Sequence, residues 1–473
     1  MLTAFEILGS LSTTGLAYAG IQSYGLGVKY WCTTDPDLKR THRDAARVRR
    51  TWNRLARYLK LYLRDDVPTV RQAMLTSESR AKEARIRTPR LVRITNDIFG
   101  VTADFKLVPS VKLKDFEDHA DDLANYWGMT RVAVHQPEAN IVRVRAVRKD
   151  PLTIPLAVSG PRHHPDLRYY TAGVDEFGQG ARIRLHNGSG IGVYGLPTYG
   201  KTSFILGLIT YLAMSDSVVF LVADGKVETG HDGDYMDVAP RALSVIGDDP
   251  IQFNGWIKEI QKFRRMRSST IRQTLGVKNM WDVGPSPEWP LVVVVIDEAH
   301  TYFEQIRATG NKELTARNAI AAENAHEVAD LVKKCRSVGI LPIIATQKGT
   351  GDAIPTMIRD NMHAAVCFAV KTDEAAQAAL GSDIKNYPDA NPTGYQAEEY
   401  IGVASMVAER RKGFTRFRSP LCRESIAAAV CDQTAGLVRS EVCPGLTIGQ
   451  AHRALLPANA TTALLSPIEK TDN

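Results

Sequence analysis

Apolar runs and helical apolar patterns alternate along the chain between residues 166 and 420. Strands are expected at 191–194, 218–222, 291–296, 339–345 and 364–370, and helices at 203–213, 257–267, 319–334 and 373–379. The strand segments are rich in aliphatic and β-branched residues and lack a polar face, as in strands that are buried on both sides of a parallel sheet. The pattern therefore predicts an α/β domain in which helices cover both faces of a mostly parallel sheet.

A smaller unit with a different pattern precedes this domain. Residues 94–150 combine strand-like segments at 101–107, 131–135 and 140–147 with an amphipathic helix at 114–127, which predicts a small α+β domain. A proline-rich stretch then leads to residue 165. The predicted division is 1–93 as an N-terminal segment, 94–165 as the small domain and its linker, 166–420 as the large domain, and 421–473 as a tail with a short apolar helix at 423–430.

The N-terminal segment contains a basic amphipathic helix, predicted from Arg43 to Arg64. Its apolar stripe consists of Ala45, Val48, Trp52, Leu55, Leu59 and Tyr62, and most of its arginines lie off that stripe. Residues 39–93 hold 17 Lys and Arg against 5 Asp and Glu, an excess of +12, so in a chain of net charge +7 the remainder carries −5. The pattern leaves three interpretations open: a solvated helix face, a contact with the DNA backbone, and a contact with an anionic membrane surface.

Residues 1–30 are mildly apolar, but Glu6 and five glycines interrupt them. They fall short of the ~20 predominantly apolar residues that a membrane span needs. No cleavable signal peptide is evident, and the six cysteines show neither paired nor metal-binding spacing, so a cytoplasmic protein with reduced thiols is expected. A peripheral membrane contact through the N-terminal segment stays open.

The candidate chemistry centres on residues 195–202, which read Gly-Leu-Pro-Thr-Tyr-Gly-Lys-Thr and match the phosphate-loop pattern G-x-x-x-x-G-K-[ST]. The loop joins a predicted strand to a predicted helix, where backbone N–H groups can face a polyphosphate. Lys201 is expected on the β- and γ-phosphates of ATP, and the Thr202 hydroxyl on Mg²⁺. The predicted nucleotide-binding residues are Gly195, Pro197, Thr198, Tyr199, Gly200, Lys201, Thr202 and Ser203.

Acidic and amide side chains follow two other predicted strands. The strand 291–296 ends in Asp297 and Glu298, and the carboxyl ends of strands are where open α/β sheets bind ligands. Asp297 is expected to hold Mg²⁺ together with Thr202, and Glu298 to polarise the attacking water. Gln347 follows the strand 339–345 and is expected to sense the γ-phosphate. With the loop, these residues predict a RecA-like P-loop ATPase that uses ATP and Mg²⁺.

The order of these motifs resembles that of the FtsK/SpoIIIE family of DNA translocases. Residues 195–202 stand in the place of its Walker A motif and 292–298 in that of its Walker B motif. The segments 336–340 and 344–347 are similar to the family's GRSxGI…ATQ block, and 358–361, 367–374 and 380–381 to its last motor block. The likeness is strongest to the stand-alone members encoded by conjugative plasmids and integrative elements of actinobacteria. Pro197 and Tyr199 depart from the small residues that the family has in its loop.

The resemblance implies a homo-hexameric ring that threads double-stranded DNA through its channel, in the service of conjugative or mobile-element transfer. In such rings an arginine from the neighbouring subunit stabilises the transferring phosphate, and Arg336 is the expected residue, with Arg359 as the second choice. One alternative is a protein-export ATPase of a type VII-like system, although such chains usually carry tandem ATPase modules. Another is a nucleotide-binding scaffold without turnover, against which the intact Lys201, Asp297 and Glu298 argue.

Overall fold

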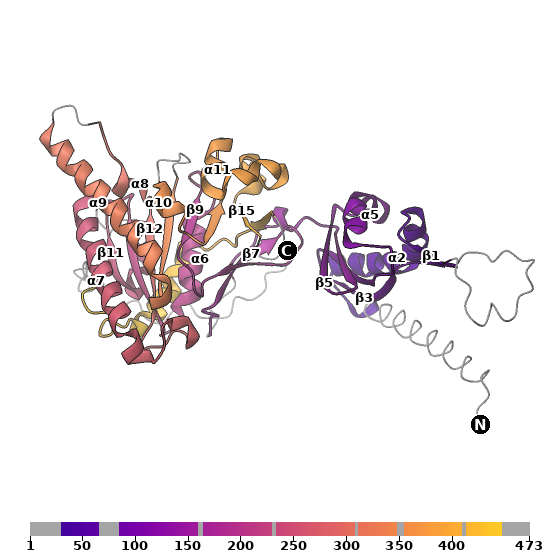
Figure 1. Ribbon diagram of the computed structural model, residues 1–473, viewed down its shortest axis with the longest axis horizontal. Helices are drawn as coiled ribbons and strands as arrows, with labels where there is room; N and C mark the ends of the chain where they lie inside the picture. The colour runs from indigo at the N-terminus through magenta and orange to yellow at the C-terminus, as the bar shows by residue number, and fades with distance from the viewer. Residues whose placement is uncertain are drawn as a thin grey trace, which may run out of the picture. The chain divides into compact units, whose positions relative to one another are not determined.

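The computed structural model describes residues 30–65, 85–158, 164–228, 233–307, 311–347, 354–408 and 413–446. They form two compact units, of which the first contains the described residues up to Ile154 together with Glu176–Gln179 (Figure 1). The second contains Pro155–Asp175 and the described residues from Gly180 onward. Residues 1–29 lie outside the described ranges, so the membrane contact considered for them stays a prediction. None of the helices within those ranges is both long enough and apolar enough to cross a bilayer.

The first unit is an antiparallel sheet covered by helices. Its strand order is β3-β4-β6-β5, with bounds β3 (Arg90–Asn96), β4 (Gly100–Lys106), β5 (Arg131–Glu138) and β6 (Ile141–Val147). The helices are α2 (Pro36–Tyr58), α4 (Leu113–Asp118) and α5 (Ala120–Trp127), and β1 (Leu63–Asp65) pairs with β2 (Arg85–Arg87). At the centre of the core, the ring centroids of Trp52 and Phe105 are 4.0 Å apart. The indole nitrogen of Trp52 donates a hydrogen bond to the Pro89 carbonyl at 2.6 Å.

The basic helix α2 begins seven residues earlier than predicted and ends at Tyr58, so the expected range of 43–64 is wrong at both ends. Asp35 caps it by accepting hydrogen bonds from the next N–H groups, and Pro36 takes the first helical position, where its missing N–H costs nothing. Lys60, with φ of +56°, turns the chain away just after the helix. The stripe from Ala45 to Leu55 is buried against the sheet. The apolar face is therefore the helix's packing face.

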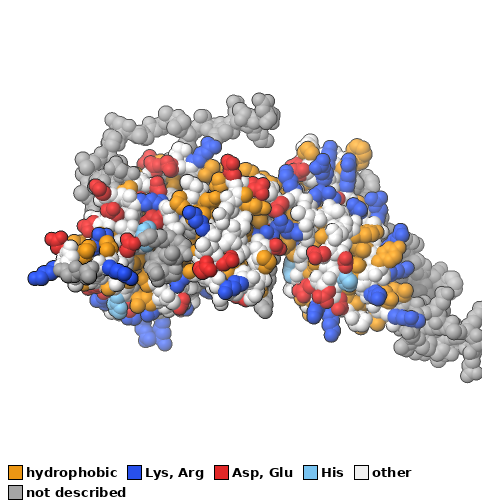
Figure 2. Space-filling view, turned by 90° about the horizontal axis from the view of Figure 1, so that it is seen from above, with side chains coloured by type: hydrophobic (Ala, Val, Ile, Leu, Met, Phe, Trp, Pro, Cys, Tyr) orange, Lys and Arg blue, Asp and Glu red, His pale blue; other side chains and the backbone are white. Residues whose placement is uncertain are grey.

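Charged side chains cover the outside of this unit. The arginines of α2 at positions 40, 43, 47, 50, 54 and 57 are exposed. Figure 2 shows Lys and Arg side chains over the face of the N-terminal unit that it displays, interspersed with Asp and Glu. Arg47 has a structural partner, because it donates hydrogen bonds to the carbonyls of Tyr126 and Trp127 at the end of α5. Arg50, Arg54 and Arg57 are exposed further along the helix. Among the described residues, Arg50 and Arg54 donate hydrogen bonds only within α2, to the Ala46 carbonyl and the Tyr58 hydroxyl.

The second unit is built on a ten-stranded sheet of order β11-β10-β12-β13-β9-β14-β15-β16-β7-β8. The first six strands are parallel and the last four are joined antiparallel. Their bounds are β7 (Tyr169–Asp175), β8 (Gly180–Arg184), β9 (Ile191–Tyr194), β10 (Val218–Asp224), β11 (Ala242–Ile246), β12 (Leu291–Asp297), β13 (Ile340–Thr346), β14 (Ala364–Cys367), β15 (Val403–Val407) and β16 (Phe414–Arg418). The predicted α/β class with a mostly parallel sheet is confirmed.

Helices cover both faces of this sheet. α6 (Lys201–Ala213) and α12 (Glu424–Gln433) pack on one face, and α7 (Pro250–Leu275), α9 (Lys312–Lys334) and α11 (Asp373–Leu380) on the other. Figure 1 shows α7 and α9 side by side. Both begin earlier than predicted, behind the caps Asp249 and Asn311, and α7 also runs past its predicted end to Leu275, where Gly276 adopts a positive φ. The short helix α8 (His300–Phe303) follows β12, and the short helix α10 (Thr356–Arg359) precedes β14.

Candidate nucleotide site

Four neighbouring parallel strands end at one edge of the sheet and bring the predicted site residues together. β10, β12, β13 and β9 lie in this order. Asp224 is the register partner of Asp297 at the tips of β10 and β12, and Thr346 is that of Tyr194 at the tips of β13 and β9. The loop after β9, the acids at the end of β12 and Gln347 after β13 therefore share this edge. It is the edge at which open α/β sheets bind ligands.

Two glycines allow the loop its shape. Gly195 has φ of +146°, and a Cβ there would come within 2.7 Å of the Phe368 Cβ. Gly200 has φ of +107° and lies against Gly402, whose Cα would be 3.2 Å from an added Cβ. Side chains are thus excluded at both positions by backbone conformation and by space. Between them Thr198 also adopts a positive φ of +68°, and its hydroxyl donates a hydrogen bond to the Pro197 carbonyl at 2.6 Å.

The loop is held by three backbone segments, one in the predicted strand 364–370 and two, at Gln396 and Gly402, for which the sequence predicts no role. The N–H of Leu196 donates to the carbonyl of Ala369 at 2.8 Å, and the carbonyl of Tyr199 accepts from the N–H of Gly402 at 3.2 Å. The Tyr199 hydroxyl donates to the Gln396 carbonyl at 2.7 Å. This last bond accounts for a large residue at a position where the resembled family has a small one. Tyr199 ties the loop to the segment that leads into β15.

Lys201 is the first residue of α6 and is only 4% exposed. Its ammonium donates hydrogen bonds to the carbonyl of Gly195 at 3.0 Å and to that of Leu196 at 3.5 Å. Burial lowers the pKa of Lys201 to about 8, although Glu298 and Asp297 act in the opposite direction. A buried ammonium beside a glycine loop is well placed to receive a polyphosphate, which would compensate its desolvation.

The next two residues of α6 have different surroundings. Thr202 is partly buried beside Lys201. The hydroxyl of Ser203 accepts a hydrogen bond from the backbone N–H of Cys422 at 2.8 Å. The structure thus gives Ser203 a packing partner in the segment before α12.

Asp297 is fully buried, and both of its carboxylate oxygens are engaged. Oδ1 accepts the backbone N–H of Glu298 at 2.9 Å, and Oδ2 accepts the hydroxyl of Tyr235 at 3.0 Å. The ammonium of Lys226 lies 3.5 Å from Oδ2 and 2.8 Å from Asp234. Burial opposes the charge of Lys226, but Asp297 and Asp234 raise its pKa above the ordinary value. Tyr235 and Lys226 are site residues for which the sequence analysis proposed no role.

Glu298 adopts a positive φ of +47° and is 4% exposed. Its Oε2 accepts the backbone N–H of Gln347 at 3.1 Å and lies 3.2 Å from the Nδ1 of His300. Burial opposes ionisation, but His300, the Gln347 N–H and Lys201 lower the pKa of Glu298 below its ordinary value. A carboxylate that is buried and still ionised can accept a proton from water. A positive φ at a non-glycine residue is a strained conformation of the kind that clusters at functional sites.

The residues present fit a Mg²⁺ ion that arrives with a nucleotide. No group of three or more His, Cys, Asp or Glu forms a metal cage within the described ranges. Mg²⁺ needs none, since in phosphate sites it keeps several waters and takes one or two protein ligands plus phosphate oxygens. Asp224 Oδ2 and Glu298 Oε1 are buried and have no hydrogen-bond partner among the described residues. Such oxygens suit a cation and its water shell.

The arginines considered for a role in a neighbouring site lie elsewhere. Arg336 is exposed in the turn before β13, which is the end of that strand opposite to Gln347. Its carbonyl accepts the indole N–H of Trp281 at 3.0 Å. Arg359, in α10, donates to the Ala378 carbonyl at 2.7 Å and to the Thr356 hydroxyl at 3.1 Å. The structure does not bring Arg336 to the phosphate loop of its own chain.

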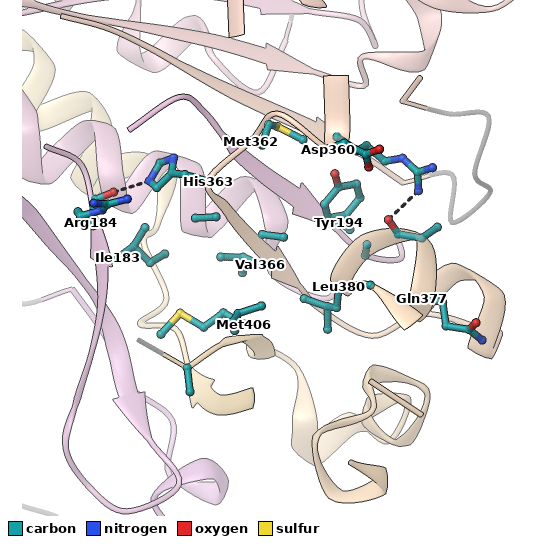
Figure 3. Close-up of a pocket in the computed structure, with 18 of the residues that line it drawn as sticks. Ile183, Arg184, Tyr194, Asp360, Met362, His363, Val366, Gln377, Leu380 and Met406 are labelled. Atoms are coloured by element: carbon teal, nitrogen blue, oxygen red, sulfur yellow. Dashed lines mark hydrogen bonds between the residues drawn. The ribbon is translucent and has the colours of Figure 1, made fainter. Parts of the chain in front are cut away.

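A separate cavity of about 1040 Å³ lies around the start of β14 (Figure 3). Its described lining residues come mainly from β8, β14, α11 and β15, with Tyr169 of β7, Tyr194 of β9 and Arg359 of α10. None of these described residues belongs to 195–203. Figure 3 shows the ring of His363 hydrogen-bonded to the Arg184 carbonyl on one side of the cavity. The distance from Nε2 of His363 to this carbonyl oxygen is 2.7 Å. Burial lowers the pKa of His363 below its ordinary value. The described lining of the cavity therefore includes no residue of the phosphate loop, although Tyr194, which lines it, directly precedes the loop.

No protein-family model and no curated protein matches this sequence. Among solved structures, the chain is similar to the conjugation coupling protein TcpA of pCW3, in its monomer form with ATPγS. The identity is 16%, the TM-score 0.49, and the match covers 73% of this chain and 94% of that one. It is also similar to the cytoplasmic domain of the type VII secretion ATPase EccC of Thermomonospora curvata, with 18% identity and a TM-score of 0.42. That match covers 61% of this chain and 33% of the EccC chain.

A third similar structure is the genome packaging NTPase B204 of Sulfolobus turreted icosahedral virus 2, in complex with AMPPCP. The identity is 11%, the TM-score 0.29, and the match covers 50% of this chain and 100% of that one. The structural neighbours of this chain thus include a conjugation coupling protein, a type VII secretion ATPase and a genome packaging NTPase.

Proposed function

We propose that this chain is an ATPase motor that moves double-stranded DNA as a hexameric ring, in the transfer of a conjugative or other mobile element. One observation carries the ATPase part: the phosphate loop, the acids Asp297 and Glu298, and Gln347 meet at the same edge of the parallel sheet. The step from ATPase to DNA motor is supported by the order of the motor blocks in the sequence and by the excess of basic residues in 39–93.

In this proposal, the loop binds the nucleotide. The backbone N–H groups of residues 198–203 surround the phosphates, and Lys201 transfers its hydrogen bonds from the carbonyls of Gly195 and Leu196 to phosphate oxygens. Thr202 and Asp297 would hold Mg²⁺, which when bound neutralises charge on the phosphates. The hydrogen bond from the Tyr199 hydroxyl to the Gln396 carbonyl keeps the loop in place.

Glu298 is the base of the proposed hydrolysis. It orients a water and accepts its proton as the water oxygen bonds to the γ-phosphorus and the bond from that phosphorus to the β–γ bridging oxygen breaks. The products are ADP and inorganic phosphate. The Gln347 N–H holds one carboxylate oxygen of Glu298, which leaves the other, Oε1, to face the water. The Gln347 side chain, at the tip of β13, would report the presence of the γ-phosphate.

The position of Arg336 suits a role between subunits. It is exposed at the edge of the sheet opposite to the loop, and in a head-to-tail ring one edge of a subunit faces the other edge of its neighbour. Arg336 would then stabilise charge on the neighbour's transferring phosphate, with Arg359 as the second candidate. The exposed arginines of α2 would contact the DNA backbone.

The proposal is tested by displacement of a third strand from a triplex placed on linear duplex DNA. With ATP, the full chain should release that strand, and the Glu298→Gln variant, which lacks the base, should not. Release that needs no hydrolysis, or no release by a chain that hydrolyses ATP, would contradict DNA translocation. The second result would favour the protein-export alternative.

A further inference from the structure

The ammonium of Lys226 lies near two carboxylates, one exposed and one buried. It is 2.8 Å from Asp234, whose side chain is 40% exposed, and 3.5 Å from Oδ2 of Asp297, which is fully buried. The Lys226 side chain itself is 26% exposed. Its backbone is fixed, because its N–H donates to Oδ1 of Asp224 at 3.2 Å. The backbone of Lys226 is therefore fixed, while its ammonium has two partners: an inner one, the buried Asp297, and an outer one, the exposed Asp234.

The inner partner needs a cation. Asp297, Asp224 and Glu298 are three carboxylates with at most 4% exposure at adjacent positions of the strand tips. Buried charges of one sign are costly unless cations or hydrogen bonds compensate them. Tyr235 supplies a hydrogen bond to Oδ2 of Asp297, and Lys226 is the cation nearest to that oxygen among the ion pairs of the described residues.

We propose that Lys226 is a positioning residue that serves as the built-in counter-cation of Asp297 and yields this carboxylate to the Mg²⁺ of an incoming nucleotide by moving fully to Asp234. The inference rests on the proposed nucleotide site and concerns how that site admits its metal. Two cations cannot share one carboxylate without repelling each other. The Mg²⁺ ion and Lys226 therefore compete for Asp297, and Asp234 receives the ammonium that is displaced.

The test measures the Mg²⁺ concentration that gives half-maximal binding of a fluorescent non-hydrolysable ATP analogue to the full chain. Lys226→Met keeps the apolar stem and removes the competitor, so the Mg²⁺ midpoint should fall about fivefold, the effect of a partly exposed charge pair. Asp234→Asn removes the outer partner and leaves Lys226 on Asp297, so the midpoint should rise about fivefold.

The double variant separates exchange from a general field effect. If Asp234 acts through Lys226, then adding Asp234→Asn to the Lys226→Met variant should not change the Mg²⁺ midpoint any further. Equal effects of Asp234→Asn in both backgrounds would overturn the proposal, as would a midpoint that Lys226→Met raises or leaves unchanged. If the Lys226→Met variant does not fold, the Asp234→Asn variant still tests the proposal, because a Mg²⁺ midpoint that does not rise in that variant contradicts the exchange.

These outcomes are distinct from failure of the proposed function. A wild-type chain that binds the analogue with a clear Mg²⁺ midpoint, in a series where the variants do not shift it, refutes the role of Lys226 and leaves the nucleotide site standing. A wild-type chain that binds no nucleotide at any Mg²⁺ concentration refutes the site and the exchange together. Thermal melting of each variant without nucleotide shows whether its fold is intact.

Discussion

The backbone N–H of Gln347 donates a hydrogen bond to the carboxylate of Glu298, with 3.1 Å between the nitrogen and Oε2. The two residues follow adjacent strands, β12 and β13, and are 49 positions apart in sequence. The bond joins the proposed base to the strand tip that carries the proposed γ-phosphate sensor. Because Gln347 contributes its backbone N–H, substitution of its side chain leaves this bond in place, whereas removal of the Glu298 side chain breaks it.

Glu298→Gln should bind ATP with wild-type affinity and hydrolyse it at least about a hundredfold more slowly, because an amide cannot accept the proton of the attacking water. The amide oxygen can still accept the Gln347 N–H, so the local geometry is retained. Equilibrium binding and single-turnover hydrolysis measure the two effects separately. Hydrolysis at the wild-type rate would show that Glu298 is not the base.

Lys201 predicts a pH dependence of nucleotide affinity. Its pKa in the structure is about 8, and a bound polyphosphate favours the charged form, so binding above pH 8 requires uptake of a proton. The association constant should be flat below pH 8 and should fall by up to about tenfold per pH unit above it. Calorimetry at pH 8.5 in two buffers of different ionisation heat measures the uptake. Binding without proton uptake would contradict the burial of this ammonium, and Lys201→Ala should bind no nucleotide.

Trp52 should be a main support of the N-terminal unit. It is 2% exposed and packs its ring against Phe105 and Phe116. Trp52→Ala should lower the free energy of unfolding by about 3–5 kcal/mol, as expected when a buried aromatic residue is truncated. Trp31→Ala is the matched control, because Trp31 is 82% exposed and should change the melting temperature little. Equal effects of the two substitutions would contradict the position of α2 in the core.

The exposed arginines of α2 predict a salt-dependent affinity for DNA. Replacing Arg50, Arg54 and Arg57 by Ala should reduce the slope of log affinity against log salt by about 0.9 for each phosphate contact that is lost. The control replaces Lys112 and Lys114 by Ala, because these two lysines are exposed in the same unit but lie outside α2. If both sets of variants keep the wild-type slope, α2 is a solvated face and not a DNA contact.

Much of the central sheet could be predicted from the sequence. Strands such as β9 and β12 are buried on both faces, so they read as continuous apolar runs, and their starts agree with the predicted positions. The four antiparallel strands of this sheet, β7, β8, β15 and β16, are not predicted by the sequence. β16, for example, reads Phe-Thr-Arg-Phe-Arg, and five residues without a clear alternation of apolar and polar positions do not indicate a strand. The predicted start of α2 is wrong because the cap Asp35, not the apolar stripe that begins at Ala45, decides where the helix begins.

The candidate site was only partly predictable, because only some of its residues belong to a local sequence motif. A phosphate loop and acids at a strand end have a residue signature, and the structure places Lys201, Asp297, Glu298 and Gln347 at one edge. The role of the loop's supports is not visible in their side chains, because Ala369, although it lies in the resembled block 367–374, and Gln396 act through backbone carbonyls. Tyr235 and Lys226 reach Asp297 from more than 60 residues away, a distance that no local pattern reports.

The most direct test of the account is the rate of ATP hydrolysis by the full chain with linear double-stranded DNA, with single-stranded DNA and without DNA, with Glu298→Gln as the blank. The account predicts Mg²⁺-dependent turnover that duplex DNA stimulates strongly and single-stranded DNA does not. Turnover that is indifferent to DNA would contradict the DNA motor and favour protein export. The absence of any turnover under all three conditions would contradict the ATPase itself.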